Sequence, residues 1–160
     1  MNDVYLDLRP TDSHPFAYKY PRPMVSADVV VLRPDADGWK ILLIRRGGEP
    51  YKDYWALPGG FWGEDEDVVE TACRELEEET GLVPAEIHQV RAYGAKNRDP
   101  RGPVVSVAHL AVVPAEAEAR AGDDAAAAQW HNIENLPPLA FDHAQMIADA
   151  LELARSKNIL

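Results

Sequence analysis

The chain has 160 residues, enough for one domain with its own core and too few for two domains of ordinary size. Its net charge of −11 disfavours DNA and RNA as partners, because nonspecific binding to nucleic acid depends on Lys and Arg side chains that neutralise phosphates. The one cysteine excludes an internal disulfide, and no apolar run reaches the ~20 residues that span a bilayer, so we expect a cytoplasmic protein with no membrane partner.

The first part of the chain is expected to form an arm followed by a β-hairpin. Residues 1–22 are polar and rich in proline, and we expect them to form an N-terminal arm with one short strand at residues 4–8. The β-branched run at residues 25–32 and the apolar run at residues 40–46 are typical of buried strands. Asp37-Gly38 between them is a hairpin signal, so the second strand is expected to return alongside the first.

The next segment is expected to be extended and then helical. Residues 55–62 form an extended stretch that Pro58-Gly59-Gly60 interrupts. A helix is predicted over residues 67–80, because apolar side chains recur at helical spacing and Gly81 follows where a C-terminal cap would stand. The predicted apolar stripe of this helix consists of Val69, Ala72, Cys73 and Leu76.

The second half of the chain is expected to supply three strands and a final helix. Asp142 is the expected N-cap of that helix, whose apolar residues recur at helical spacing. Strands interrupted by two separated helices are typical of a mixed sheet with one helix packed on each side. The predicted strands cover residues 86–95, 103–113 and 127–132, and the predicted helix covers residues 141–156 with a buried stripe of Met146, Ile147, Ala150, Leu151 and Ala154.

Three glutamates share one face of the helix predicted over residues 67–80, beside its apolar stripe. Glu75, Glu78 and Glu79 fall within roughly 100° of one another on a helical wheel. Like charges at this spacing destabilise a helix, and near its C-terminal end they also oppose the macrodipole. A divalent cation such as Mg²⁺, which prefers oxygen ligands, would relieve this repulsion. Charge count alone leaves a solvated acidic face as an equal alternative.

The spacing of residues between Gly60 and Leu82 resembles the pattern of a known family. Gly60 is followed after five residues by Glu66, and after seven more by the run Arg74-Glu75-Leu76-Glu77-Glu78-Glu79-Thr80-Gly81-Leu82. This arrangement matches every fixed position of the Nudix box, and the flanks resemble the family from about residue 20 to residue 154. The resemblance implies an α/β (α+β) fold, the Nudix α/β/α sandwich with a mixed β-sheet flanked by helices, over residues 23–156.

The resemblance to the Nudix box also implies the chemistry. Family members hydrolyse a nucleoside diphosphate linked to another group with Mg²⁺ or Mn²⁺, so the chain is expected to be a Nudix pyrophosphohydrolase. By position, Glu75, Glu78 and Glu79 resemble the metal ligands, and the Gly59 carbonyl is an expected addition. Glu75 and Glu78 are also implied in catalysis, with Glu75 acting as or near the general base. Which glutamate is the base stays open.

Two further box positions are implied to organise the glutamates. Arg74 resembles the residue that orients them and is counted among the catalytic residues. Glu66 resembles a support for the loop before the helix.

A more diffuse similarity outside the box favours ADP-ribose as the small nucleotide substrate, cleaved to AMP and ribose 5-phosphate. It resembles a group of Nudix proteins that includes ADP-ribose pyrophosphatases, and it covers residues 20–32, 93–111, 121–130 and 136–151. Guanidinium groups suit phosphates, and the candidate substrate contacts are Arg45, Arg46, Arg98 and Arg101, each with solvent exposure as the alternative. Phe61 and Trp62 could stack on a base, but we expect them to pack in the core.

Other functions of the same domain stay open at this point. One is a non-catalytic Nudix module that senses ADP-ribose, although the chain ends about one helix after the sheet and carries no basic patch that would read DNA. Another is hydrolysis of a different nucleotide: an oxidised nucleoside triphosphate, a dinucleoside polyphosphate or NADH. The family resemblance also implies a homodimer, to which the N-terminal arm could contribute.

Overall fold

A computed structural model describes residue 20, residues 22–122 and residues 125–160 of the chain. The expected strand at residues 4–8 and nearly all of the expected arm lie outside the described residues. In the described part, neither helix is long and apolar enough to cross a membrane. The elements are β1 (Met24–Asp35), β2 (Gly38–Arg46), β3 (Trp55–Ala56), β4 (Gly59–Phe61), α1 (Val68–Thr80), β5 (Ile87–Tyr93), β6 (Val104–Val112), β7 (Ala125–Asn132) and α2 (His143–Ser156).

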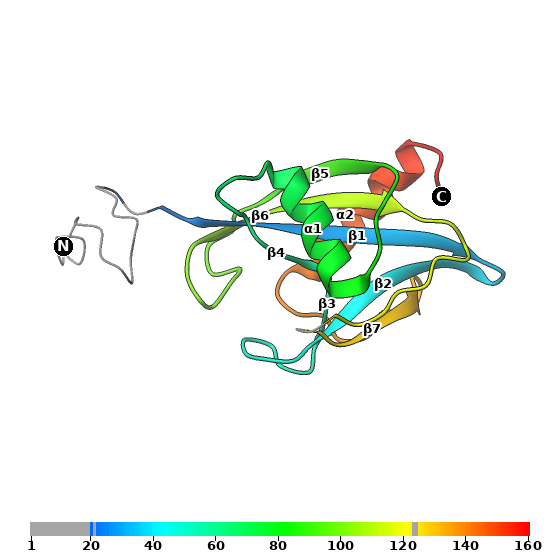
Figure 1. Cartoon of the computed structure of the whole chain (residues 1–160), viewed down its shortest axis with the longest axis horizontal. Helices are drawn as coiled ribbons and strands as arrows, with labels where there is room; N and C mark the ends of the chain where they lie inside the picture. The colour runs from blue at the N-terminus through cyan, green and yellow to red at the C-terminus, as the bar shows by residue number, and fades with distance from the viewer. Residues whose placement is uncertain (1–19, 21, 123–124) are drawn as a thin grey trace.

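The seven described strands form one mixed sheet, as predicted, with the central order β3-β2-β1-β6-β5 (Figure 1). β1 and β6 run parallel over nine residue pairs from Met24↔Val104 to Leu32↔Val112. The remaining pairings are antiparallel, including β2 with β7 on the outer side of the hairpin and β5 with β6 at the other edge. Two parallel strands must be joined by a long crossover connection, and here that connection is the chain between β1 and β6, which includes α1.

The β1–β2 hairpin opens as it leaves its turn. The two strands pair only near the turn, from Leu32↔Ile41 to Asp35↔Gly38. Farther along, the same edge of β1 pairs with β4 and the same edge of β2 pairs with β3. The residues between β3 and β4, Leu57 and Pro58, therefore run through a gap within the sheet, where the Pro58 carbonyl accepts a hydrogen bond from Val29 N at 2.9 Å.

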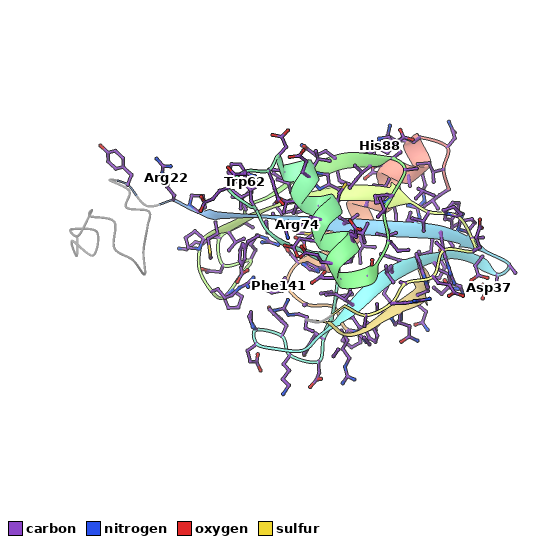
Figure 2. The ribbon with its side chains drawn as sticks, viewed as in Figure 1. Arg22, Asp37, Trp62, Arg74, His88 and Phe141 are labelled. Atoms are coloured by element: carbon purple, nitrogen blue, oxygen red, sulfur yellow. The ribbon has the colours of Figure 1, made fainter. Side chains whose placement is uncertain are left out.

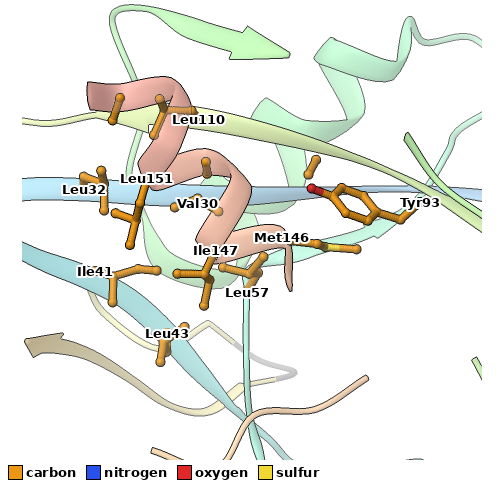
Figure 3. Packing of buried hydrophobic residues seen from close by; sticks show 13 residues of the cluster. Val30, Leu32, Ile41, Leu43, Leu57, Tyr93, Leu110, Met146, Ile147 and Leu151 are labelled. Atoms are coloured by element: carbon orange, nitrogen blue, oxygen red, sulfur yellow. The ribbon is translucent and has the colours of Figure 1, made fainter. Parts of the chain in front are cut away.

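The two helices cover opposite faces of the sheet, α1 in front and α2 behind in Figure 1. Because successive strand residues point to opposite faces, β1 serves both layers. Val29 and Val31 pack into the cluster that contains Ala72 and Leu76 of α1. The neighbours of these valines along β1 point the other way, into the α2 layer. That second cluster includes Val30, Leu32, Ile41, Leu43, Leu57, Leu110, Met146, Ile147, Ala150, Leu151 and Ala154 (Figure 3).

Most predicted elements are confirmed within one or two residues at each end, although β1 extends three residues beyond its predicted end, to Asp35. Gly81 adopts the left-handed conformation with φ of 73°, which a C-terminal cap requires, and donates its N–H to Glu77 O at 2.8 Å. The predicted apolar stripe is wrong at Val69, whose surface is 40% exposed. Val68 packs against the α1 cluster instead, because it lies one turn before Ala72 on the face toward the sheet.

Replacement of a fully enclosed α2 residue tests the contribution of the second layer. Ile147 is 1% exposed in the α2 cluster, so Ile147→Ala is expected to lower the free energy of unfolding by about 2–5 kcal/mol through lost burial and a cavity. Chemical denaturation followed by circular dichroism would measure the change. Glu152→Ala, on the exposed side of the same helix, is the matched control and should change stability by less than about 0.5 kcal/mol. Equal effects of the two substitutions would contradict this packing.

Candidate functional site

A cleft of about 170 Å³ lies where β1 and β2 separate. Its walls come from both faces of the sheet, since they include Glu79 of α1 and His143 of α2. The remaining lining residues belong to β1, β2 and β4, to two loops, and to residues 57–60, which we call the glycine segment. They are Ser26, Asp28, Ile44, Arg46, Leu57, Gly59, Gly60, Phe61, Arg98, Asp99, Arg101 and Phe141.

Two glycines allow the chain to pass through the gap in the sheet. A Cβ atom at Gly59 would lie 2.3 Å from the Ala27 carbonyl oxygen, a backbone atom of β1 that cannot move freely. A Cβ atom at Gly60 would lie 2.3 Å from Cδ of Glu75. Both distances are far shorter than van der Waals contact. Glycine is required at Gly59, where the neighbour is backbone, whereas at Gly60 the Glu75 side chain would have to move.

Glu79 is tied to the glycine segment by a hydrogen bond. Its Oε2 accepts the N–H of Gly59 at 2.9 Å. Burial, together with the negative charges of Glu75 and Asp28, raises the pKa of the Glu79 carboxyl to about 8, although the Gly59 N–H and the charge of Arg46 act in the opposite direction. The last turn of α1 therefore brings a carboxylate into the cleft where other carboxylates already oppose its ionisation.

Arg74 holds three other carboxylates of the acidic segment. It lies on α1 (Figure 2), where its Nε donates to Glu66 Oε1 at 2.5 Å and its Nη1 donates to Glu75 Oε1 at 2.7 Å and to Glu78 Oε2 at 3.2 Å. Hydrogen bonds from Arg74 and from the Thr71 hydroxyl lower the pKa of Glu66 to about 2. Glu66 and Arg74 thus form a charged link between the loop and the helix.

The expected metal ligands do not all point toward one place. Among residues 20, 22–122 and 125–160, no three His, Cys, Asp or Glu side chains stand close enough together to hold a metal ion as they are placed. Glu75 and Glu78 face Arg74, whereas Glu79 faces Gly59. The donor set nevertheless suits a hard divalent cation, because the carboxylates and the Gly59 carbonyl are oxygen ligands and because Glu75 opposes the ionisation of Glu79. Glu75, Glu78, Glu79 and the Gly59 carbonyl stay predicted ligands.

Three of the four predicted substrate arginines line the cleft. Arg46 is half-buried, donates Nε to the Pro50 carbonyl at 2.7 Å, and lies over the Phe141 ring at 5.0 Å. Arg101 pairs with Asp99 at 2.7 Å, and both burial and the charge of Arg101 lower the pKa of Arg46. The fourth arginine lies elsewhere. Arg45 forms an ion pair with Asp53 at 3.1 Å outside the cleft.

The third arginine anchors the start of α2. The Arg98 side chain is only 4% exposed and donates to both oxygens of Asp142, at 2.6 and 2.8 Å. Asp142 stands at the N-cap position, as predicted, but its side chain makes no capping hydrogen bond. The Asp142 oxygens bond to Arg98 and not to the backbone N–H groups of the helix, because a two-point ion pair with a guanidinium is stronger than a capping hydrogen bond.

Phe61 and Trp62 are solvent-exposed, so the expectation that they pack in the core is wrong. Their surfaces are 39% and 50% exposed. The Arg101 guanidinium lies over the Phe61 ring at 4.9 Å and over the Phe141 ring at 5.6 Å. Phe141 has a φ of 51°, a left-handed conformation that is uncommon outside glycine and here places its ring in the cleft.

With this geometry established, the sequence was compared with known proteins. It matches the NUDIX domain over residues 22–150. The chain belongs to the Nudix family. It is 42% identical over 130 residues to the ADP-ribose pyrophosphatase of Methanocaldococcus jannaschii, and the match covers 81% of this chain and 74% of that protein.

Regulators with a Nudix domain are similar as well. The chain is 34% identical over 142 residues to the ADPR responsive transcriptional repressor NtrR of Acinetobacter baylyi, a match that covers 86% of this chain but 57% of the repressor. The solved NUDIX domain of Shewanella oneidensis NrtR complexed with ADP ribose has a TM-score of 0.79 at 32% identity, with coverage of 84% of this chain and 90% of that domain. The Nudix sandwich fold expected from the box is therefore confirmed.

Several cleft residues of this Nudix domain are not among the predicted site residues. Asp28 sits inside a β-branched strand, yet its Oδ2 accepts a hydrogen bond from the Ser106 hydroxyl. His143 is the first residue of α2, and burial lowers its pKa. Phe141 stands in an ordinary loop. Only the folded sheet brings them together, because Asp28 and His143 are more than a hundred residues apart.

Gly60→Ala is expected to weaken metal binding by the Nudix site on the order of tenfold, as loss of a supporting contact at a metal site does. The added Cβ would displace the Glu75 carboxylate, while folding is retained because a flexible side chain can yield. Titration with Mn²⁺ monitored by calorimetry would measure the affinity. Gly48→Ala is the control, because nothing lies within 4 Å of its added Cβ. An unchanged Mn²⁺ affinity in Gly60→Ala would contradict the assignment.

Proposed function

We propose that this Nudix protein hydrolyses the diphosphate bond of ADP-ribose in a Mg²⁺- or Mn²⁺-dependent reaction and releases AMP and ribose 5-phosphate. The observation that carries the proposal is the cleft itself, which sets the carboxylate of Glu79 opposite the guanidinium groups of Arg46 and Arg101. Similarity to the ADP-ribose pyrophosphatase of Methanocaldococcus jannaschii supports the choice of substrate.

Arg46 is suited to bind a phosphate group. Its guanidinium makes no ion pair with a carboxylate in the described part of the chain, and its one hydrogen-bonded partner is the Pro50 carbonyl. Burial and the nearby charge of Arg101 disfavour the cationic form of Arg46, whereas the charges of Glu79, Asp99 and Asp28 favour it. A further anion between the two guanidinium groups would stabilise both. A diphosphate would supply that anion, and planar guanidinium groups bind phosphate oxygens in pairs.

The acidic side of the cleft complements the basic side. Glu75, Glu78, Glu79 and the Gly59 carbonyl are the residues that would hold the cation. When bound, a divalent cation neutralises the diphosphate and lowers the pKa of water in its coordination shell. Arg74 keeps Glu75 and Glu78 in place through the contacts described above, and the Gly59 N–H keeps Glu79 in place. Hydrolysis adds water to one phosphorus atom and breaks its bond to the bridging oxygen.

A second candidate function is binding of ADP-ribose without turnover. It is favoured by the similarity to the ADPR responsive repressor and to the NUDIX domain of NrtR solved with ADP ribose. A single assay separates the two functions, because only an enzyme releases AMP. Calorimetric binding of ADP-ribose with no AMP detected by chromatography would favour the sensor over the enzyme.

Glu78→Gln tests the metal-dependent reaction with little risk to folding, because the Glu78 side chain is 59% exposed. Loss of its charge is expected to lower kcat for ADP-ribose at least about a hundredfold, the effect of several kcal/mol of lost transition-state stabilisation. AMP release with Mg²⁺, and with Mg²⁺ removed by EDTA, would measure the change. Glu77→Gln, an exposed neighbour that has no assigned role, should retain wild-type activity. If Glu78→Gln is as active as wild type, the proposed metal site is wrong.

Arg46→Ala tests the phosphate contact. We expect KM for ADP-ribose to rise about 10- to 150-fold, because a hydrogen bond to a charged group contributes about 1.5–3 kcal/mol. Steady-state kinetics would measure KM. Arg45→Ala is the control, because Arg45 is paired with Asp53 outside the cleft, and its loss should change KM by less than about threefold. If Arg45→Ala raises KM more than Arg46→Ala does, the sequence prediction for Arg45 holds and the cleft is not the phosphate-binding site.

The expected homodimer and the cytoplasmic location stay predictions. Light scattering of the purified chain would test the first of them.

A further inference from the structure

A buried histidine on α2 contacts the segment that carries the site glycines. The Leu57 N–H donates a hydrogen bond to His143 Nδ1 at 3.0 Å, and both partners are buried. Leu57 directly precedes Pro58-Gly59-Gly60. The site described above assigns no role to this side chain, and it is 86 residues away from its partner in the sequence.

This hydrogen bond decides which nitrogen of the imidazole carries the proton. A backbone N–H can only donate, so Nδ1 must be the unprotonated acceptor, and the neutral ring then carries its proton on Nε2. Nε2 lies 3.8 Å from Asp28 Oδ1, across a distance too long for a direct hydrogen bond. The ring therefore sits with its acceptor toward the glycine segment and its donor toward a carboxylate of the cleft wall.

The helix that carries His143 is itself held firmly at this end. The buried Arg98 side chain bonds to both oxygens of the preceding Asp142. On the segment side, the Leu57 side chain packs in the α2 cluster beside Ile147 (Figure 3). Leu57 is thus fixed to α2 by its side chain and by its N–H together, which leaves its backbone little freedom.

The glycine segment is held at three consecutive residues. His143 accepts from Leu57 N, the Pro58 carbonyl accepts from Val29 N at 2.9 Å, and Glu79 accepts from Gly59 N at 2.9 Å. These bonds come from α2, β1 and α1 respectively. Only His143 contributes a side chain from outside the Nudix box and its helix, so it links the second face of the sheet to the site.

We propose that His143 is a positioning residue for the reaction: its Nδ1 fixes the backbone of Leu57 so that Gly59 presents its N–H to Glu79 and its carbonyl to the cation. This inference rests on the proposed function, because it assigns His143 to the same site. His143 does not touch the reacting atoms. An alternative role, in which the imidazole only fills space in the core, predicts that an apolar side chain of similar size would replace it.

Two substitutions separate these roles. In His143→Asn, Oδ1 is bonded to Cγ as Nδ1 is in histidine, so the acceptor for Leu57 N–H is retained. In His143→Leu the volume is kept and the acceptor is lost. His131→Leu is the matched control, because His131 is a half-buried histidine of β7 whose Nε2 has no hydrogen-bond partner in the described part of the chain.

The readouts are amide hydrogen exchange at Leu57 and Gly59 by NMR, Mn²⁺ affinity by calorimetry, and kcat and KM for ADP-ribose. For His143→Leu we expect faster exchange at Leu57 and a loss of about 10–100-fold in Mn²⁺ affinity and in kcat, the range for residues that support a metal site, with KM little changed. His143→Asn should restore protection and most of the Mn²⁺ affinity. His131→Leu should match wild type in all of them.

Two results would overturn the proposal. One is a folded His143→Leu with wild-type exchange at Leu57 and wild-type Mn²⁺ affinity. The other is a His143→Asn variant as impaired as His143→Leu, which would assign the effect to volume or to Nε2 and not to the Nδ1 acceptor. If wild type binds Mn²⁺ but releases no AMP, the proposed function fails, while the exchange and Mn²⁺ measurements still decide the role of His143.

Discussion

The separation of β1 from β2 is the constraint on which the site depends. The hairpin pairs over only four residue pairs, and the backbone groups that it leaves unpaired must find partners because they are buried. The chain from Trp55 to Phe61 supplies these partners by pairing first with β2 and then with β1. At Gly59 the segment passes so close to β1 that an added Cβ atom would lie 2.3 Å from the Ala27 carbonyl oxygen, and this close approach accounts for the glycine. The cleft is the space that remains in the gap, which is why both helices reach it.

Charge within the acidic segment is arranged in two separate groups. Arg74 binds Glu66, Glu75 and Glu78, so one cation offsets three carboxylates at the surface. Glu79 lies outside that group. It is half-buried, its carboxylate accepts a backbone N–H, and its raised pKa reflects the cost of ionisation there. Glu79 is therefore the carboxylate of this segment whose ionisation an added cation would favour most.

Local patterns in the sequence predicted the elements, the two helical layers and the box residues, because each depends on spacing along the chain. For example, Gly38 and Gly81 both have positive φ angles, which glycine adopts readily, so the residue type predicts the backbone conformation. The rest depended on contacts that spacing does not encode. Arg45 and Arg46 are adjacent and alike, yet strand alternation sends only Arg46 into the cleft. Asp28 and Ser106 come from different strands, and the parallel register of β1 and β6 is what joins them.

The placement of α2 follows from the same gap in the sheet. Its apolar stripe would be satisfied anywhere over the second face, since hydrophobic contact is not directional. The polar contacts at its first turn fix its position: Asp142 with Arg98, and His143 with Leu57. Both of those partners lie on segments that line the cleft, so the register of α2 and the shape of the cleft are set by the same bonds. A helix with no residue of the Nudix box thereby becomes part of what holds the site in shape.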